Sequence, residues 1–143
     1  MRRKIATLAA ASAFLAAGML ATATSASATV DPPAGGWDHT WTTSDSVPGG
    51  TVYIAEHGDV VSLCDTDADS LAPRVSIAVE ESIAGAYDIR YTLTASGGEG
   101  SCVVARASQG GVYDLPEGKN IGVTIWLGPD RRNQTQHYYK NDH

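Results

Sequence analysis

The chain has 143 residues with 10 Lys or Arg and 16 Asp or Glu, so its formal net charge is −6. This length leaves no room for two ordinary domains, and an acidic chain repels phosphate backbones, so nucleic acid is not expected as a partner. After the N-terminal segment there is no second run of about 18 apolar residues, so no membrane span is expected in the mature chain.

Residues 1–28 have the pattern of a secretory signal peptide. Residues 1–4 carry three basic side chains, residues 5–20 are apolar and Ala-rich, and Ala26-Ser27-Ala28 is a small-residue cleavage signal. Cleavage after Ala28 would leave 115 residues with seven basic and 16 acidic side chains, a net charge of −9. The sequence therefore predicts a secreted protein.

Residues 29–38 are predicted to be an extended leader, because they contain two prolines and two adjacent glycines and no periodic apolar pattern. A single β domain is expected over residues 39–143. Within it, apolar and polar residues alternate with a period of two in three segments, 74–80, 87–94 and 120–127. Successive side chains of a strand point to opposite faces, so each segment presents one apolar and one mostly polar face. In the second segment the apolar set is Tyr87, Ile89, Tyr91 and Leu93.

Shorter strands are expected at residues 39–43, 51–56, 60–65 and 101–107. Clusters of Gly, Pro and Asp separate all of these segments and favour tight turns. No segment has the apolar spacing of a long helix, and one short helical turn is expected near residues 81–86. The sequence thus predicts an all-β fold, a small antiparallel β-sandwich or barrel of about seven strands. Tyr138-Tyr139 belongs either to a docked last strand or to an exposed tail.

Cys64 and Cys102 are the only cysteines, so only one pairing is possible. Outside the cell a thiol pair within reach normally oxidises. The bond would close a loop of 39 residues, and the chain-entropy model gives roughly 4 kcal/mol of stabilisation for such a loop. A zinc site is the alternative, but no Cys-x-x-Cys or His-x-x-x-His pattern supplies its further ligands. A structural disulfide is therefore predicted.

Residues 65–70, directly after Cys64, have the sequence DTDADS. Carboxylates at every second position, Asp65, Asp67 and Asp69, are typical of the first half of a calcium loop. The second half departs from that pattern, because Ser70 replaces the glycine of the sharp turn and Ser76 replaces the bidentate glutamate. The three aspartates are therefore candidates for a weak calcium site, and a solvated acidic turn is the preferred interpretation. No cofactor is expected.

Residues 37–41 have the sequence WDHTW. If this segment is extended, Trp37, His39 and Trp41 lie on one face, with about 7 Å between successive side chains. Such an aromatic platform can stack on sugar rings or on the proline and methylene groups of a partner. These residues are therefore candidate ligand-binding residues. Alternatively, a mature chain without Phe uses its Trp side chains to cover the core, and this second interpretation is preferred.

Known catalytic patterns are missing from the sequence. It contains no Gly-x-Ser-x-Gly, no His-Glu-x-x-His and no Gly-rich loop that leads into a helix. Glu80 and Glu81 are adjacent, so in a strand they would point to opposite faces and could not act as a paired acid and base. We therefore do not expect an enzyme.

Residues 49–70 contain a Gly-Gly pair, then His57-Gly58-Asp59, then the run LCDTDADS. This segment resembles a group of small secreted actinobacterial proteins in which the pattern GG…(Y/G)GD…(V/L)CD…AD(G/S) precedes an alternating strand. The Ala-rich leader fits the same source. The resemblance implies a small all-β extracellular protein. The group has no assigned function, so the resemblance implies no catalytic residues, and Ser70 occupies the position of the group's usual Gly.

Three functions are compatible with these features. The first, which we expect, is a secreted non-catalytic binding module for an unknown extracellular protein or glycan. The second is a proteinaceous inhibitor of an extracellular hydrolase, with residues 97–101 beside Cys102 as the candidate loop, because a rigid loop loses little entropy on binding. The third is a small secreted enzyme with an unrecognised site at the turn formed by residues 65–69.

Overall fold

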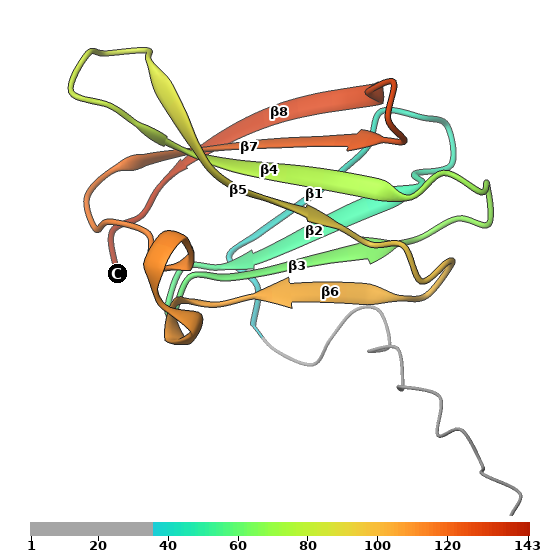
Figure 1. Cartoon of the computed structure of the whole chain (residues 1–143), viewed down its shortest axis with the longest axis horizontal. Coiled ribbons are helices and arrows are strands. Elements are labelled where there is room, and N and C mark those ends of the chain that lie inside the picture. Colours follow the sequence, from blue (N-terminus) through green and yellow to red (C-terminus); the bar gives the residue numbers. More distant parts are fainter. Residues whose placement is uncertain (1–35) are drawn as a thin grey trace, which may run out of the picture.

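A computed structural model describes residues 36–143 (Figure 1). The predicted signal peptide and residues 29–35 of the predicted leader lie outside the described residues. The described part folds into β1 (His39–Thr42), β2 (Gly50–Ala55), β3 (Val60–Asp65), β4 (Pro73–Glu80), β5 (Tyr87–Thr94), β6 (Cys102–Ala105), the short 3-10 helices η1 (Ala107–Gln109) and η2 (Gly111–Tyr113), β7 (Asn120–Leu127) and β8 (Arg132–Lys140). In this part of the chain no helix is long and apolar enough to cross a membrane.

The strands form two four-stranded antiparallel sheets that pack face to face (Figure 1). Their orders are β1-β2-β3-β6 and β5-β4-β7-β8. The predicted all-β fold is therefore confirmed, and of the two predicted architectures the sandwich is the one that forms. Within residues 36–143 it has eight strands rather than about seven.

The core lies between the two sheets and comes from the predicted alternation. In β4 the inward residues Val75 and Ile77 are fully buried, and so are Ile121, Val123 and Ile125 of β7. The first sheet contributes fully buried side chains from β2 and β3, namely Val52, Ile54, Val61 and Leu63. Because side chains on these strands alternate between inside and outside, Cys64 faces outward and Asp65 faces the space between the sheets.

The eighth strand, β8, resolves the open question about Tyr138-Tyr139. The segment is a docked edge strand beside β7, with Ile121 paired to Tyr139 and Gly122 to Tyr138. Tyr139 is 7% exposed, whereas Tyr138 points outward and is half exposed. The other residues of β8 are mostly exposed and polar, so its sequence carries little apolar alternation.

Two residues of the predicted apolar face of β5, Tyr87 and Ile89, lie on the outer face of the sheet. A β-bulge between Ile77 and Ala78 shifts the pairing of β4 with β5, so that Tyr91 pairs with Ile77 but Ile89 pairs with Ala78. A bulge inserts one extra residue and reverses the facing of the strand beyond it. Ile89 therefore lies on the outer face and is 57% exposed, while Tyr91 stays in the core. The prediction that both belong to one apolar face is wrong.

The expected short helical turn near residues 81–86 is a hairpin turn between β4 and β5. Its ends are joined by the Glu81 N–H, which donates to the Ala86 carbonyl at 2.8 Å. Helical structure lies instead at η1 and η2, after β6 has ended at Ala105. The predicted strand over residues 101–107 is accordingly shorter at both ends.

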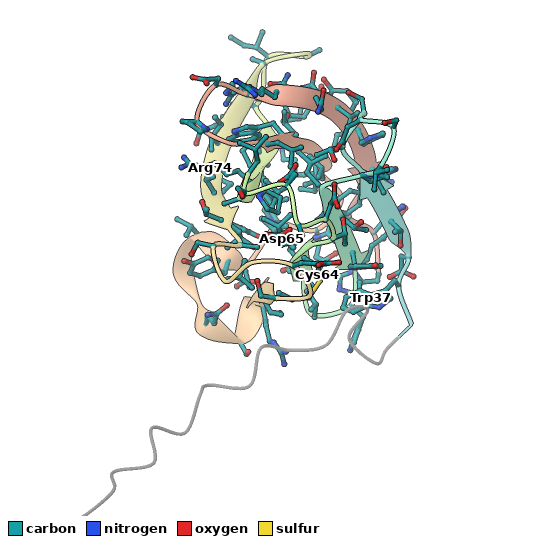
Figure 2. All side chains as sticks on the ribbon, turned by 90° about the vertical axis from the view of Figure 1, so that its right-hand side faces the viewer. Trp37, Cys64, Asp65 and Arg74 are labelled. Atoms are coloured by element: carbon teal, nitrogen blue, oxygen red, sulfur yellow. A yellow bond between two sulfur atoms is a disulfide. The ribbon has the colours of Figure 1, made fainter. Side chains whose placement is uncertain are left out.

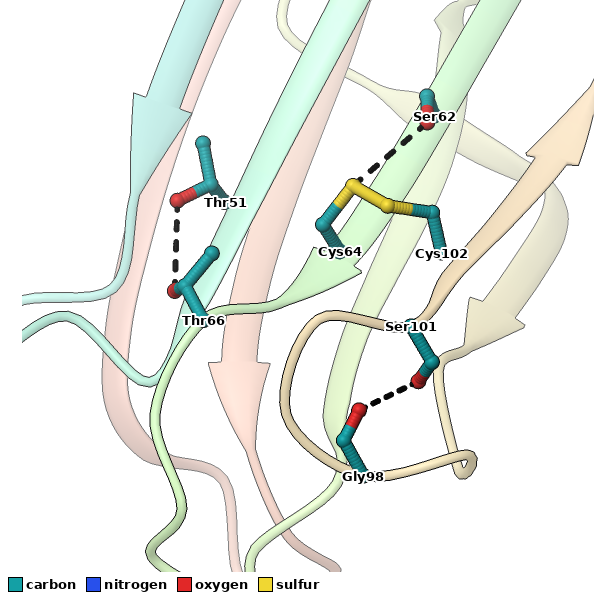
Figure 3. Close-up of a disulfide and its surroundings, with 7 residues drawn as sticks. All are labelled: Thr51, Ser62, Cys64, Thr66, Gly98, Ser101 and Cys102. Carbon is teal, nitrogen blue, oxygen red and sulfur yellow. Dashed lines mark hydrogen bonds between the residues drawn. A yellow bond between two sulfur atoms is a disulfide. The ribbon is translucent and has the colours of Figure 1, made fainter. Parts of the chain in front are cut away.

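The predicted disulfide between Cys64 and Cys102 is present. The two residues are directly opposite each other in the antiparallel pairing of β3 and β6. The bond therefore ties the two strands at the point where β3 ends and β6 begins (Figure 3).

Candidate functional site at one end of the sandwich

The predicted aromatic platform is only partly assembled. His39 and Trp41 share the inner face of β1, and their rings stack with centroids 5.0 Å apart. They do not face open solvent, because Trp41 also stacks on His137 of β8 at 4.8 Å and His39 contacts Tyr139 at 4.8 Å. These rings close the side of the sandwich where β1 and β8 meet. The interpretation that Trp41 covers the core fits this packing.

Trp37 lies apart from the other two predicted platform residues. Its ring contacts Tyr53 of β2, with centroids 5.6 Å apart. Val52 and Ile54 on either side of Tyr53 are fully buried in the core, so the Tyr53 side chain lies on the outer face of the sheet. Trp37, His39 and Trp41 therefore do not form one surface.

A pocket of about 340 Å³ lies at the end of the sandwich where β3 ends. Its walls come from Asp65 at the end of β3, from the connection between β3 and β4 and from the connection between β5 and β6. The lining residues of the two connections are Asp67, Ala68, Ser70, Ala72, Ser96, Gly98 and Glu99. Figure 2 looks onto this end of the molecule, with Asp65 near the middle of the view. The pocket thus lies between the two sheets, at the point where their connecting loops meet.

Asp65 is the most deeply placed polar residue of this pocket. It follows the inward alternation of Val61 and Leu63 in β3, so its side chain points toward the space between the sheets. The residue is 5% exposed, and its Oδ1 atom is buried without a hydrogen-bond partner. Burial raises the pKa of the Asp65 carboxyl, a hydrogen bond from the Asp67 backbone N–H lowers it in part, and the negative charges of Asp69, Glu99 and Asp67 raise it again, so that the net shift is upward.

The carboxylates around Asp65 differ from the predicted set. Asp65 and Asp67 line the pocket, and the third lining carboxylate is Glu99 from the β5–β6 connection rather than Asp69. Asp69 serves its own loop, because its Oδ1 accepts a hydrogen bond from the Leu71 N–H at 2.7 Å. Within residues 36–143, no group of three His, Cys, Asp or Glu side chains is arranged to hold a metal ion. The weak calcium site therefore stays a prediction.

The loop that carries Glu99 is held by several hydrogen bonds. The Asp65 N–H donates to the Ser101 carbonyl and the Gly100 N–H donates to the Asp65 carbonyl, so the loop is bonded to the end of β3. Within the loop, the Ser101 hydroxyl donates to the Gly98 carbonyl at 2.6 Å (Figure 3). The adjacent disulfide fixes the start of β6. Residues 97–101 thus form a braced loop, held by hydrogen bonds and by the adjacent disulfide.

On the other side of the pocket, the chain after β3 is also held in place. The Thr66 hydroxyl donates to the Pro48 carbonyl at 2.6 Å and lies 3.5 Å from the Thr51 hydroxyl (Figure 3). Farther along, Ser70 has a φ of 64°, a left-handed conformation that favours glycine.

The opposite end of the sandwich holds a second buried aspartate, Asp59, which precedes β3. It is 3% exposed, and both of its carboxylate oxygens have partners. Oδ2 accepts from the Leu115 N–H at 2.8 Å, and Oδ1 accepts from the Asn141 side-chain amide at 3.1 Å. This network joins the β2–β3 turn, the loop before β7 and the C-terminal segment. Its hydrogen bonds make it a structural connection between these three segments.

Comparison with protein-family models, with curated proteins and with solved structures finds no match to this chain. The pocket therefore has to be interpreted from its own residues. Asp65 and Asp67 were detectable in the sequence because they alternate directly after a strand. Glu99 was not detectable in the sequence, because the pairing of β3 with β6 is what brings its loop to the pocket.

Proposed function

We propose that the protein is a secreted, non-catalytic binding module that receives its ligand in the pocket beside Asp65. The observation that carries this proposal is Asp65, a buried residue that lines a pocket of about 340 Å³ and whose Oδ1 atom has no hydrogen-bond partner. A buried polar atom without a partner costs free energy, and a ligand that supplies the missing hydrogen bond recovers that cost. Cavities of roughly 300 to 1,000 Å³ are the usual size for ligand sites.

The braced walls support a binding role. Because the loop over residues 97–101 is bonded to the end of β3, it loses little conformational entropy when a ligand docks. Secretion is part of the same proposal. Its support is the signal-peptide pattern of residues 1–28 and a disulfide, which persists in oxidising compartments.

A retention experiment with the secreted protein tests this function. The wild-type protein would be immobilised and exposed to proteins from the culture medium of its source and to soluble cell-wall polymers. Ala68→Leu adds a larger side chain on the exposed wall of the pocket, and Ala86→Leu makes the same change in the exposed β4–β5 turn at the opposite end of β4. We expect the wild type and Ala86→Leu to retain the same component and Ala68→Leu to lose it.

Two results of that experiment would count against the proposal. Retention of nothing by the wild-type protein would remove the binding function. Equal retention by Ala68→Leu would place the function outside the pocket.

Inhibition of an extracellular hydrolase is the second candidate function. The braced and exposed loop around Gly98 and Glu99 favours it, since inhibitors present a fixed segment to the enzyme. A panel of extracellular proteases and amylases would be assayed with the wild type and with Glu99→Ala. Inhibition of one enzyme that is weakened in Glu99→Ala would support this function, and activity unchanged across the panel would exclude it.

A further inference from the structure

The lining of the pocket has an excess of hydrogen-bond acceptors and negative charge. Asp65, Asp67 and Glu99 contribute three carboxylates, and Ser70 and Ser96 add hydroxyl groups. No Lys, Arg or His is part of the lining. The ion pairs formed by residues 36–143 involve His39 with Glu56, Lys140 with Asp142 and His143 with Glu117, so none of them includes a carboxylate of the pocket.

The buried state of Asp65 shows that the acidic character is not limited to the rim. Glu99 is exposed and can remain hydrated, but Asp65 is 5% exposed and its Oδ1 has no partner. A buried carboxylate among like charges is stabilised most by a cation that also donates hydrogen bonds. The ligand is therefore expected to be a hydrogen-bonding cation.

The shape of the site favours an organic cation over a bare metal ion. Calcium needs six to eight oxygen ligands within about 2.6 Å, whereas the carboxylates here are not gathered into a metal-binding group. The remaining walls are small, because Ala68, Ala72 and Gly98 leave the space between the carboxylates unfilled. A cavity of about 340 Å³ has room for a long side chain.

Between the two basic side chains, guanidinium suits the acceptors better than ammonium. Arginine has five N–H donors in a planar fork that matches a carboxylate in bidentate geometry, whereas lysine has three donors around a point charge. The lining supplies three carboxylates, those of Asp65, Asp67 and Glu99, and the hydroxyl groups of Ser70 and Ser96. A guanidinium group can bond to several of these acceptors at once.

We propose that the pocket takes the guanidinium group of an arginine side chain presented by an extracellular protein partner. The inference rests on the proposed binding function and names the chemistry of its ligand. The acidic composition of the chain fits this assignment, since a negative surface raises the encounter rate with a basic partner. Asp65 acts as the inner acceptor, and Glu99 acts at the rim.

A titration with N-acetyl-L-arginine methylamide, observed by NMR of the backbone amides at neutral pH, tests the assignment. This probe has the arginine side chain and a peptide-like backbone without free charges. We expect saturable shifts at Asp65, Gly98 and Glu99. The citrulline analogue has the same shape but no charge, and it should not bind. The lysine analogue should bind more weakly.

Variants of the pocket locate the interaction. Asp65→Asn should weaken binding of the arginine probe by at least about tenfold, because it removes the charge of a buried partner. Glu99→Gln should weaken it by about two- to threefold, as expected for an exposed charge. Glu81→Gln, an equivalent change of an exposed glutamate in the β4–β5 turn, should leave the affinity unchanged. Ala68→Leu should reduce binding without any change of charge, which keeps the test valid if Asp65→Asn folds poorly.

Three results would overturn the assignment. The first is the absence of saturable shifts with the arginine probe, and the second is equal affinity for the citrulline analogue. The third is a set of shifts that calcium chloride causes, while neither the arginine probe nor sodium chloride of equal ionic strength causes them. Free arginine that binds as tightly as the blocked probe would overturn the choice of a protein side chain. If arginine fails but Ala68→Leu still abolishes partner retention, the binding function stands and only the ligand class is wrong.

Discussion

Two buried aspartates, Asp59 and Asp65, lie at opposite ends of β3 and have opposite surroundings. Asp59 is bonded through both oxygens to Leu115 and Asn141. Asp65 accepts a hydrogen bond from the Asp67 backbone but keeps its Oδ1 without a partner, and the charges near it are those of Asp69, Glu99 and Asp67. The two aspartates are thus buried to nearly the same extent but differ in their hydrogen-bond partners and in the charges around them.

The difference shows how a structural carboxylate is told apart from a candidate binding carboxylate. A buried charge whose hydrogen bonds are complete contributes to the free energy of folding, and its loss leaves other groups unpaired. A buried carboxylate that lines a cavity and lacks a partner is a cost to the fold unless a ligand completes it. By this criterion Asp59 belongs to the architecture, and Asp65 belongs to a site.

Removal of the disulfide should have the largest effect, and it acts at the Asp65 end. Cys64→Ala with Cys102→Ala, or chemical reduction, opens a loop of 39 residues. We expect the free energy of unfolding to fall by roughly 4 kcal/mol in the chain-entropy model. Thermal unfolding with and without reductant measures this loss. An unchanged midpoint would show that the bond between β3 and β6 contributes no stability.

Truncation of Asn141 tests the opposite end. Asn141 is fully buried and donates to Asp59 at 3.1 Å and to the Leu115 carbonyl at 3.3 Å. Asn141→Ala should lower the free energy of unfolding by about 2 kcal/mol, because the charged oxygen of Asp59 loses its partner. The matched variant Asn120→Ala breaks an exposed bond to Glu80 and should cost less than about 0.5 kcal/mol. Equal losses in the two variants, measured by chemical denaturation, would contradict the structural role of the Asp59 network.

The strands were predictable where a strict period of two is combined with burial on one face. β4 and β7 satisfy this condition, because each lies between two neighbours and places Val75 or Ile125 in the core. β8 is an edge strand with one fully covered aromatic residue, so its alternation is weak. The bulge between β4 and β5 leaves Arg90 of β5 unpaired, and because it depends on the pairing of the two strands, the alternation of the sequence places Ile89 on the wrong face.

The candidate site was predictable in part for a similar reason. Asp65 and Asp67 alternate directly after a strand, and that pattern is local. Asp69 has the same spacing, but its carboxylate bonds to its own loop at the Leu71 N–H. Glu99 becomes a neighbour only after β6 has paired with β3. The alternation in residues 37–41 correctly places His39 and Trp41 on one face of a strand. Their coverage by Tyr139 and His137 of β8 depends on the packing of the two sheets and has no local signal in the sequence.

Replacement of Ser70 by glycine should change the free energy of unfolding less than removal of the disulfide or Asn141→Ala does, and it should raise rather than lower it. Ser70 has a φ of 64° at the wall of the pocket, where a side chain is strained. Ser70→Gly should raise the free energy of unfolding by about 1 kcal/mol, because glycine adopts the left-handed region without that strain. Ser46→Gly lies in another exposed loop without a positive φ and should lower stability slightly, because glycine adds entropy to the unfolded chain. Destabilisation by both glycines would argue against strain at Ser70.

The pH dependence of stability should show the smallest effect. The pKa of Asp65 is raised above its ordinary value of 3.8, because burial and the charges of Asp69, Glu99 and Asp67 outweigh the lowering by the Asp67 backbone hydrogen bond. The folded protein therefore binds this proton more tightly than the unfolded chain. The resulting stability is fully present below pH 3.8 and is lost as the pH rises through the raised pKa. Subtraction of the Asp65→Asn profile from the wild-type profile, both from chemical denaturation, should leave this downward slope. A difference that rises with pH would mean that Asp65 is stabilised in its charged form.

Equal substitutions at the two aspartates test the central claim most directly. The free energy of unfolding would be measured at neutral pH for Asp59→Asn and Asp65→Asn, two variants that each remove one negative charge at a buried position. Asparagine tolerates the φ of 49° at position 59, so backbone strain does not confound the comparison. We expect Asp59→Asn to lose about 2 to 3 kcal/mol, because its amide cannot accept from both donors, and we expect Asp65→Asn to be at least as stable as the wild type. A loss in Asp65→Asn as large as that in Asp59→Asn would contradict the distinction between a structural end and a binding end of this sandwich.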